Sequence, residues 1–161
     1  AAAGGLAAGP GLSDGVAGAR VTFYVLADAD ERARRTYACR LVEKAYLQDH
    51  KVLVRLDTPD DVRDFDELLW RFSDRSFVPH ETCPPAGAGD APVLLTAGSE
   101  PPAPADILVN LGRDVPAWYD RFERVAELVA ADEESRRAGR ERFRHYRDQG
   151  IAPETHNLGA S

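Results

Sequence analysis

The stretch VTFYVLADADERARRTYACRLVEKAYLQDHKVLVRL, residues 21–56, decides the fold of this chain. Its first part, VTFYVLA at 21–27, is almost continuously apolar and rich in β-branched and aromatic residues, as is typical of a strand covered on both faces. The aspartates of DAD, 28–30, offer N-cap oxygens to a helix over about 30–47. KVLVRL at 51–56 has the composition of a second buried strand. Two such strands joined by a helix predict a parallel sheet.

The rest of the chain continues this alternation. The further expected elements are a helix over about 58–71 capped by Asp57-Thr58-Pro59, buried strands at 91–97 and 106–111, the segment FERVAELVA at 122–130, and a basic helix that begins near Asp132 and ends at Gly150. The segment 122–130 fits either a helix or a strand, and its valines and short length favour a strand. The order predicts an α/β fold of three layers, a mostly parallel sheet flanked by helices on both faces.

Length and composition indicate one folded unit. A chain of 161 residues suits a single domain with a full core. We expect a disordered Ala/Gly-rich tail over 1–19, a single α/β domain over 20–152 and a flexible C-terminal tail over 153–161. No apolar run reaches the ~20 residues needed to cross a bilayer. Cys39 and Cys83 have neither the spacing of a close pair nor that of a metal site, which favours reduced thiols and a cytoplasmic location.

The stretch SRRAGRERFRHYR, 135–147, is strongly basic inside a chain of net charge −7. Arg136, Arg140, Phe143, Arg144 and Arg147 recur at helical spacing and share one face. An aromatic ring among guanidinium groups could hold a ligand that is both apolar and anionic, and a local basic field steers such a partner. The alternative is a solvated helix face with Phe143 turned into the core, and the residues alone leave both open.

A second segment, ELLWRFSDRSFVPH at 67–80, gathers Trp70, Phe72 and Phe77 around a short polar break. Several large aromatic side chains near a loop are either part of the core or an exposed apolar patch that marks a protein interface. Taken alone, this segment favours the core.

The motifs of catalysis and cofactor binding are missing from the sequence. No glycine-rich turn follows the first strand, and no G-x-x-x-x-G-K-[ST] phosphate loop occurs. Asp28 and Asp30 are explained as a helix cap rather than as magnesium ligands, and Cys39 as a core thiol. His80 and Cys83 supply two potential zinc ligands where four are needed. We therefore expect no catalytic residue, no cofactor and no metal.

Several segments in a fixed order resemble one family. TFYVL, KVLVR, LLWRFSDRSFVPH, PVLLT, DILVNL and RERFRHYRDQG together are similar to the chi subunit of bacterial DNA polymerase III holoenzyme, over about residues 20–151. The resemblance implies a non-enzymatic clamp-loader accessory. It also implies a fold like that of mononucleotide-binding proteins, without a phosphate loop and without a cofactor.

The resemblance also implies partners and sites. The family binds the acidic C-terminal tail of single-stranded DNA-binding protein, which ends in apolar residues and a free carboxylate. By position, tail binding falls on Arg136, Arg140, Phe143, Arg144 and, on the pocket wall, Val129. Phe143 and Arg144 stand where the family often has Tyr and Lys, so a phenolic hydrogen bond is lost while the charge is kept.

A second interface is implied at Trp70, Phe77 and Pro79. Its partner in the family is the psi subunit, another clamp-loader component or a DNA-repair helicase. DNA is reached only indirectly in this view, no membrane is involved, and the expected location is the cytoplasm, at the replisome.

Two other function classes stay open from the residues alone. The chain could bind single-stranded nucleic acid directly through the arginine-rich helix, although its net charge of −7 counts against this. It could also be a small-molecule enzyme on a degenerate α/β fold, which would need an occupied pocket at the carboxyl ends of the strands.

Overall fold

A computed structural model describes residues 19–82, 91–97 and 105–158 of the chain. All of its strands belong to one seven-stranded sheet of order β4-β5-β3-β6-β7-β2-β8, and each pairing is parallel. The strands are β2 (Arg20–Val25), β3 (Val52–Arg55), β4 (His80–Thr82), β5 (Val93–Thr96), β6 (Ile107–Asn110), β7 (Arg124–Val129) and β8 (Glu154–Asn157). The helices are α1 (Glu31–Leu47), α2 (Pro59–Arg71) and α3 (Glu133–Asp148), with a 3-10 turn at Tyr119–Arg121. The predicted α/β fold is confirmed.

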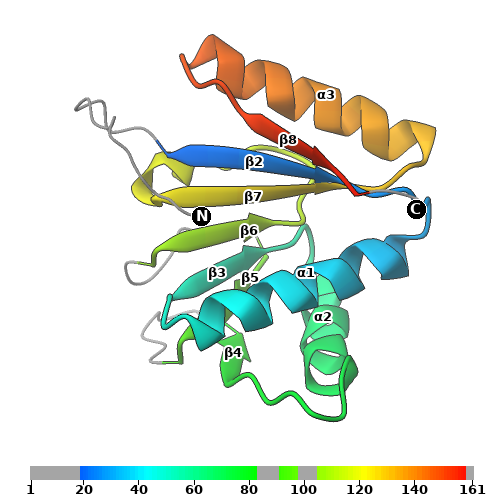
Figure 1. Ribbon diagram of the computed structural model, residues 1–161, viewed down its shortest axis with the longest axis vertical. Coiled ribbons are helices and arrows are strands. Elements are labelled where there is room, and N and C mark those ends of the chain that lie inside the picture. Colours follow the sequence, from blue (N-terminus) through cyan, green and yellow to red (C-terminus); the bar gives the residue numbers. More distant parts are fainter. Residues whose placement is uncertain (1–18, 83–90, 98–104, 159–161) are drawn as a thin grey trace.

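The helices cover both faces of the sheet, as predicted (Figure 1). On one face, α1 and α2 pack on side chains such as Val54 and close a core in which Phe65 is fully buried. On the other face, α3 packs over β2 and β7, where Tyr146 is buried against Phe23. Consecutive strand residues point to opposite faces, so one set of strands supplies both cores.

The ends of the helices follow from their capping residues. Asp30, Thr58 and Asp132 each accept a hydrogen bond from a backbone N–H of the helix they precede, all at 3.0 Å. At the end of α3, Gly150 has a φ of 88°, and the following N–H, that of Ile151, donates to Tyr146 O at 3.0 Å. This left-handed glycine ends the helix and returns the chain toward the sheet.

Two strands differ from the sequence analysis. The segment 122–130 forms a strand as predicted, but β4 was not predicted, because three residues carry too little pattern. Residues 154–157, which were assigned to a flexible tail, pair as β8 with β2, and Leu158 N–H donates to Val25 O at 2.8 Å. The expected flexible tail is therefore wrong for this stretch. Of the expected N-terminal tail, Ala19 is buried, and 1–18 lie outside the described residues.

Candidate functional site

Helix α3 is fixed to the sheet by a buried polar cluster. The guanidinium of Arg142 donates from Nε to Glu127 Oε1 at 2.7 Å, and the Tyr146 hydroxyl donates to Glu127 Oε2 at 2.6 Å. Asn110 donates to the same oxygen at 2.9 Å. Burial, and then the charge of Glu127, raise the pKa of Tyr146. The helix is thereby held in one rotation, with its opposite side facing solvent.

A cavity of about 250 Å³ opens between α3 and the edge of the sheet. It is lined by Phe23, Val25, Val129, Arg136, Gly139, Arg140, Phe143 and Thr155. The lining is mainly apolar, and its two charged members, Arg136 and Arg140, are both exposed. The structure therefore brings together four of the five residues expected to bind an acidic tail. The fifth, Arg144, is exposed on α3 but does not line the cavity.

The depth of the cavity depends on a close approach of helix to strand. A Cβ atom at Gly139 would lie only 2.9 Å from Val129 Cγ2, closer than real side chains approach. Phe143 is half-buried, and its ring lies 5.2 Å from that of Phe23. The sequence left open whether Phe143 binds a ligand or turns into the core. In the structure its ring does both, because it packs against the core and also lines the cavity.

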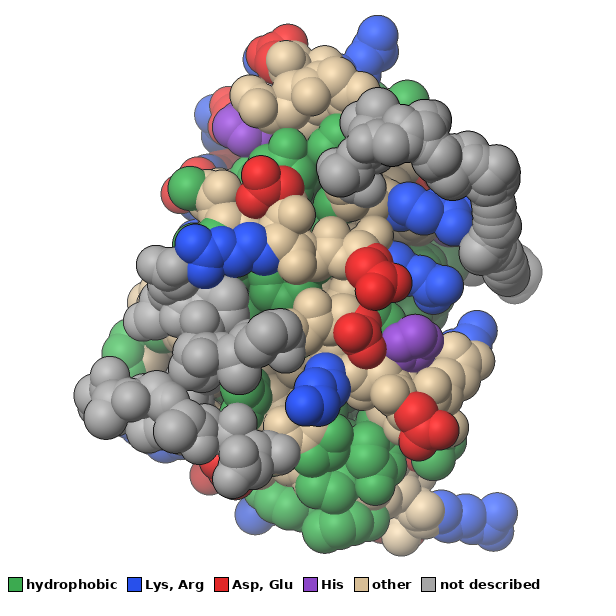
Figure 2. All heavy atoms as spheres, turned by 90° about the vertical axis from the view of Figure 1, so that its left-hand side faces the viewer, with side chains coloured by type: hydrophobic (Ala, Val, Ile, Leu, Met, Phe, Trp, Pro, Cys, Tyr) green, Lys and Arg blue, Asp and Glu red, His purple; other side chains and the backbone are tan. Residues whose placement is uncertain are grey.

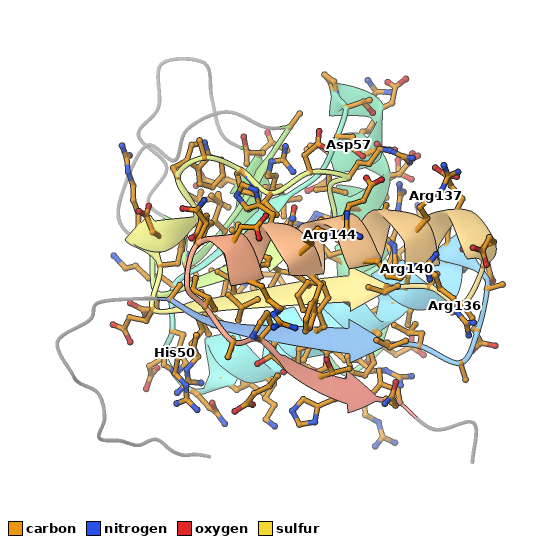
Figure 3. All side chains as sticks on the ribbon, turned by 90° about the horizontal axis from the view of Figure 1, so that it is seen from above. His50, Asp57, Arg136, Arg137, Arg140 and Arg144 are labelled. Atoms are coloured by element: carbon orange, nitrogen blue, oxygen red, sulfur yellow. The ribbon has the colours of Figure 1, made fainter. Side chains whose placement is uncertain are left out.

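The arginines of α3 differ in their ion pairs (Figure 3). Arg137 pairs with Glu134, which also holds Arg113. Arg140 lies 3.3 Å from Glu133, in an exposed pair of the kind worth about 0–1 kcal/mol. Among the described residues, no carboxylate lies within ion-pair distance of Arg136 or Arg144. At the cavity, Arg136 is thus available to an incoming anion, and Arg140 is engaged only in a weak, exposed pair.

The aromatic segment after α2 forms a surface, not a core. The side chains of Trp70 and Phe77 are 44% and 67% exposed, and their rings lie 5.3 Å apart. Pro79 is half-buried beside them, whereas Val78 is buried. Figure 2 shows hydrophobic side chains gathered at the lower end of the molecule, where β4 and the loop after α2 lie in Figure 1. The preference for core that the segment alone suggested is wrong for these two rings.

A buried histidine supports the exposed tryptophan. The His80 ring lies 4.2 Å from that of Trp70, and its Nδ1 lies 2.7 Å from Val78 O. Its Nε2 is 3.0 Å from Asp66 Oδ1 but outside the geometry of a hydrogen bond. The buried His80 ring therefore packs against the Trp70 ring and holds it in position.

At the edge where α/β proteins bind nucleotides, a side chain bridges the ends of two strands, and a cavity lined by Asp28, Asp30 and Arg32 follows β2. Ligands of such sheets sit beyond the carboxyl ends of the strands. At that edge, Arg34 donates to Leu111 O and to Leu128 O, each at 3.1 Å, and so bridges β6 and β7. Burial raises the pKa of the Cys39 thiol to about 12, which leaves it inert as a nucleophile.

Neither a metal-binding cluster nor a membrane-spanning helix occurs in the described part of the chain. Among residues 19–82, 91–97 and 105–158, no group of three or more His, Cys, Asp or Glu side chains could hold a metal ion. Within the same residues, no helix is long and apolar enough to span a membrane. Cys83, of the His80–Cys83 pair, lies outside the described part of the chain.

Sequence reasoning missed half of the cavity wall. Phe23 and Val25 were expected as strand residues, and their alternation in β2 was the only signal that they share a face. Thr155 gave no signal, because β8 was not predicted. Gly139 lies in mid-helix, where a glycine costs about 1 kcal/mol relative to alanine and so hints at a close contact.

Comparison with known proteins gives a consistent result. The family model described as DNA polymerase III chi subunit, HolC, matches residues 19–154. The chain is 39% identical to DNA polymerase III subunit chi of Pseudomonas aeruginosa over 139 residues, which are 86% of this chain and 96% of that protein. It is 27% identical to the subunits of the same name from Haemophilus influenzae, over 85% of this chain and 96% of that protein, and from Escherichia coli, over 81% and 92%. The matched residues include α3 and the loop after α2.

Proposed function

This chain belongs to the DNA polymerase III chi subunit family, a family of replication subunits, and we propose that it acts there as a non-catalytic adaptor. In this role it binds the acidic C-terminal tail of single-stranded DNA-binding protein and links that protein to the clamp loader. The observation that carries the proposal is the apolar cavity with Arg136 and Arg140 at its opening.

The cavity suits the chemistry of such a tail. Arginines without carboxylate partners attract its acidic residues from a distance, and this attraction weakens with salt. The terminal apolar side chain fills the space beside Val129 and Phe143, and a guanidinium pairs with the terminal carboxylate. Among the residues that the structure describes, Glu133 pairs with Arg140 alone, and this pair is exposed, so a ligand carboxylate can replace Glu133 at little cost. Phe143 contributes contact area without the hydroxyl of a tyrosine.

The second part of the adaptor is the surface of Trp70, Phe77 and Pro79. Large exposed aromatic side chains are typical anchors of protein interfaces. Trp70 is in addition held in position by its contact with the buried His80 ring. In the proposed function this surface contacts the psi subunit, another clamp-loader protein or a DNA-repair helicase. It lies on α2 and the following loop, away from α3, so one partner can be held at each site (Figure 1).

Calorimetric titration of the full chain with the C-terminal peptide of its single-stranded DNA-binding protein tests the proposal. Arg140→Ala should lower the affinity roughly tenfold or more, since a hydrogen bond to a charged group contributes about 1.5–3 kcal/mol. The matched control is Arg137→Ala, on the same helix but paired with Glu134. A second control, Trp70→Ala, should leave peptide binding unchanged.

Two results would contradict the proposal. One is the absence of peptide binding at low salt. The other is equal binding by a control peptide that lacks its final residue, because the cavity is proposed to read that residue and its carboxylate. DNA binding that is lost in Arg140→Ala, without any peptide binding, would instead favour a nucleic-acid role for α3.

A further inference from the structure

The face of the sheet opposite the α3 cavity is open at β2 and β8. Helix α1 packs on β3, β6 and β7, and Figure 1 shows it crossing the sheet below β2 and β8. Because side chains alternate along a strand, Phe23 and Val25 face α3 while Tyr24 faces the α1 side. The same alternation sends Thr155 to the cavity and His156 to the open face.

Three aromatic rings form a platform on this open face, the Tyr24 platform, made of Tyr24, Tyr37 and His156. The His156 ring stacks on Tyr24 at 5.6 Å with an angle of 17° between the ring planes. Tyr37, from α1, lies 5.7 Å from Tyr24. His156 is exposed, and both tyrosines are half-buried. The platform is therefore reachable from solvent and held in place by its neighbours.

Arginines lie on the same side of the sheet as the Tyr24 platform. Arg20 and Arg124 are register partners on adjacent strands, and Arg40, on α1, lines the same surface hollow as Tyr37. All three are exposed, and within the described residues none has a carboxylate at ion-pair distance. Glu154 pairs in register with Thr22 on the same strand face, and Asp28 and Asp30 line the hollow that holds Tyr37 and Arg40, so the like-charge pair on this side is Arg20 beside Arg124. Like charges placed directly opposite in a sheet are destabilising, so an external anion would relieve this arrangement.

We propose that the Tyr24 platform, with Arg20, Arg40 and Arg124, binds single-stranded nucleic acid. Rings on a sheet face stack with unpaired bases, and neighbouring arginines neutralise the phosphates between them. A duplex would not fit this chemistry, because its bases are already stacked inside. An acidic peptide would satisfy the arginines but make little use of the stacked rings. The inference is independent of the tail-binding role proposed for α3, which uses the other face.

Fluorescence anisotropy of a labelled oligothymidylate, titrated with the full chain at moderate salt, where charges on the opposite face are screened, tests the phosphate contacts. The variant Arg40→Glu/Arg124→Glu should bind roughly tenfold more weakly and show a smaller salt slope, since two phosphate contacts are lost. The control, Arg136→Glu/Arg140→Glu, makes the same change in net charge on the opposite face and should bind within about twofold of the wild type. Equal losses in both variants, or no binding by the wild type, would overturn the proposal.

The stacking contact is tested separately by His156→Ala. The side chain is exposed and β8 is held by backbone pairing, so loss of the ring on Tyr24 should lower the melting temperature by only about 2–4 °C. Affinity for the oligonucleotide should fall about fivefold or more, because one base–aromatic stack is lost. Thr155→Ala, the neighbour on the other face, should bind normally. Unchanged binding by His156→Ala, or displacement of the oligonucleotide by poly-glutamate of equal charge, would show a general anion surface and overturn the proposal.

Discussion

At the scale of single residues, the candidate cavity depends on a glycine, Gly139, which has no side chain to keep α3 away from the sheet. Gly139 lets α3 approach β7 so closely that Val129 forms both core and cavity wall. A glycine inside a helix costs about 1 kcal/mol relative to alanine. Overpacking a rigid contact costs about 1–3 kcal/mol. The second effect is the larger, so the glycine stabilises the protein as well as shaping the cavity.

Gly139→Ala is therefore expected to destabilise the chain by up to about 2 kcal/mol in urea unfolding, the difference between these two effects. It should also weaken binding of the acidic tail peptide, because the new methyl group pushes α3 away from Val129 and shifts Phe143. Glu141→Ala, on the exposed side of the same helix, serves as the control for helix propensity. A more stable Gly139→Ala variant with full peptide affinity would show that the contact is not rigid.

At the scale of elements, strongly patterned segments were predictable and weakly patterned ones were not. Continuous apolar runs identified β2, β3, β5 and β6, and the valines of 122–130 decided correctly for a strand. β8 has the sequence ETHN, without an apolar side chain, because an edge strand that packs little needs none. Its pairing depends on the exposed backbone of β2, which no sequence pattern reports.

The turns that end α1 and α3 allow a paired prediction at this scale. Each helix is followed, two positions after its last residue, by a residue of positive φ, Asp49 at 66° and Gly150 at 88°. In both turns the next N–H donates to a carbonyl of the last helical turn at 3.0 Å, from His50 to Ala45 and from Ile151 to Tyr146. The left-handed conformation costs about 1–2 kcal/mol in residues with a side chain and little in glycine.

Gly150→Ala should lower the free energy of unfolding by about 1 kcal/mol, and Asp49→Gly should change it in the opposite direction by a smaller amount, since aspartate tolerates this conformation better than most residues. Urea unfolding of both variants measures the two effects against one wild-type curve. If both variants lose stability, contacts of the Asp49 side chain contribute more to stability in the turn after α1 than the relief of backbone strain does.

At the scale of the whole molecule, the sheet separates two basic surfaces on a chain of net charge −7. Helical spacing along α3 was enough to predict the arginine and phenylalanine face of one. The Tyr24 platform could not be predicted, because its three rings come from β2, α1 and β8, and only the strand order brings them together. Short-range patterns predict which side chains share an element, and long-range pairing decides which elements share a surface.

The two surfaces use alternate residues of the same strands, which leads to a final prediction. Val25 and Thr155 line the α3 cavity, whereas Tyr24 and His156 form the opposite face, so ligands at the two sites do not overlap. If both proposals hold, the tail peptide and an oligothymidylate bind together. The affinity for each, measured by titration with the other at saturation, should stay within about twofold at moderate salt, where like charges on opposite faces are screened. Mutual displacement would place both ligands on one surface, and the Arg136→Glu/Arg140→Glu and Arg40→Glu/Arg124→Glu variants would then identify which one.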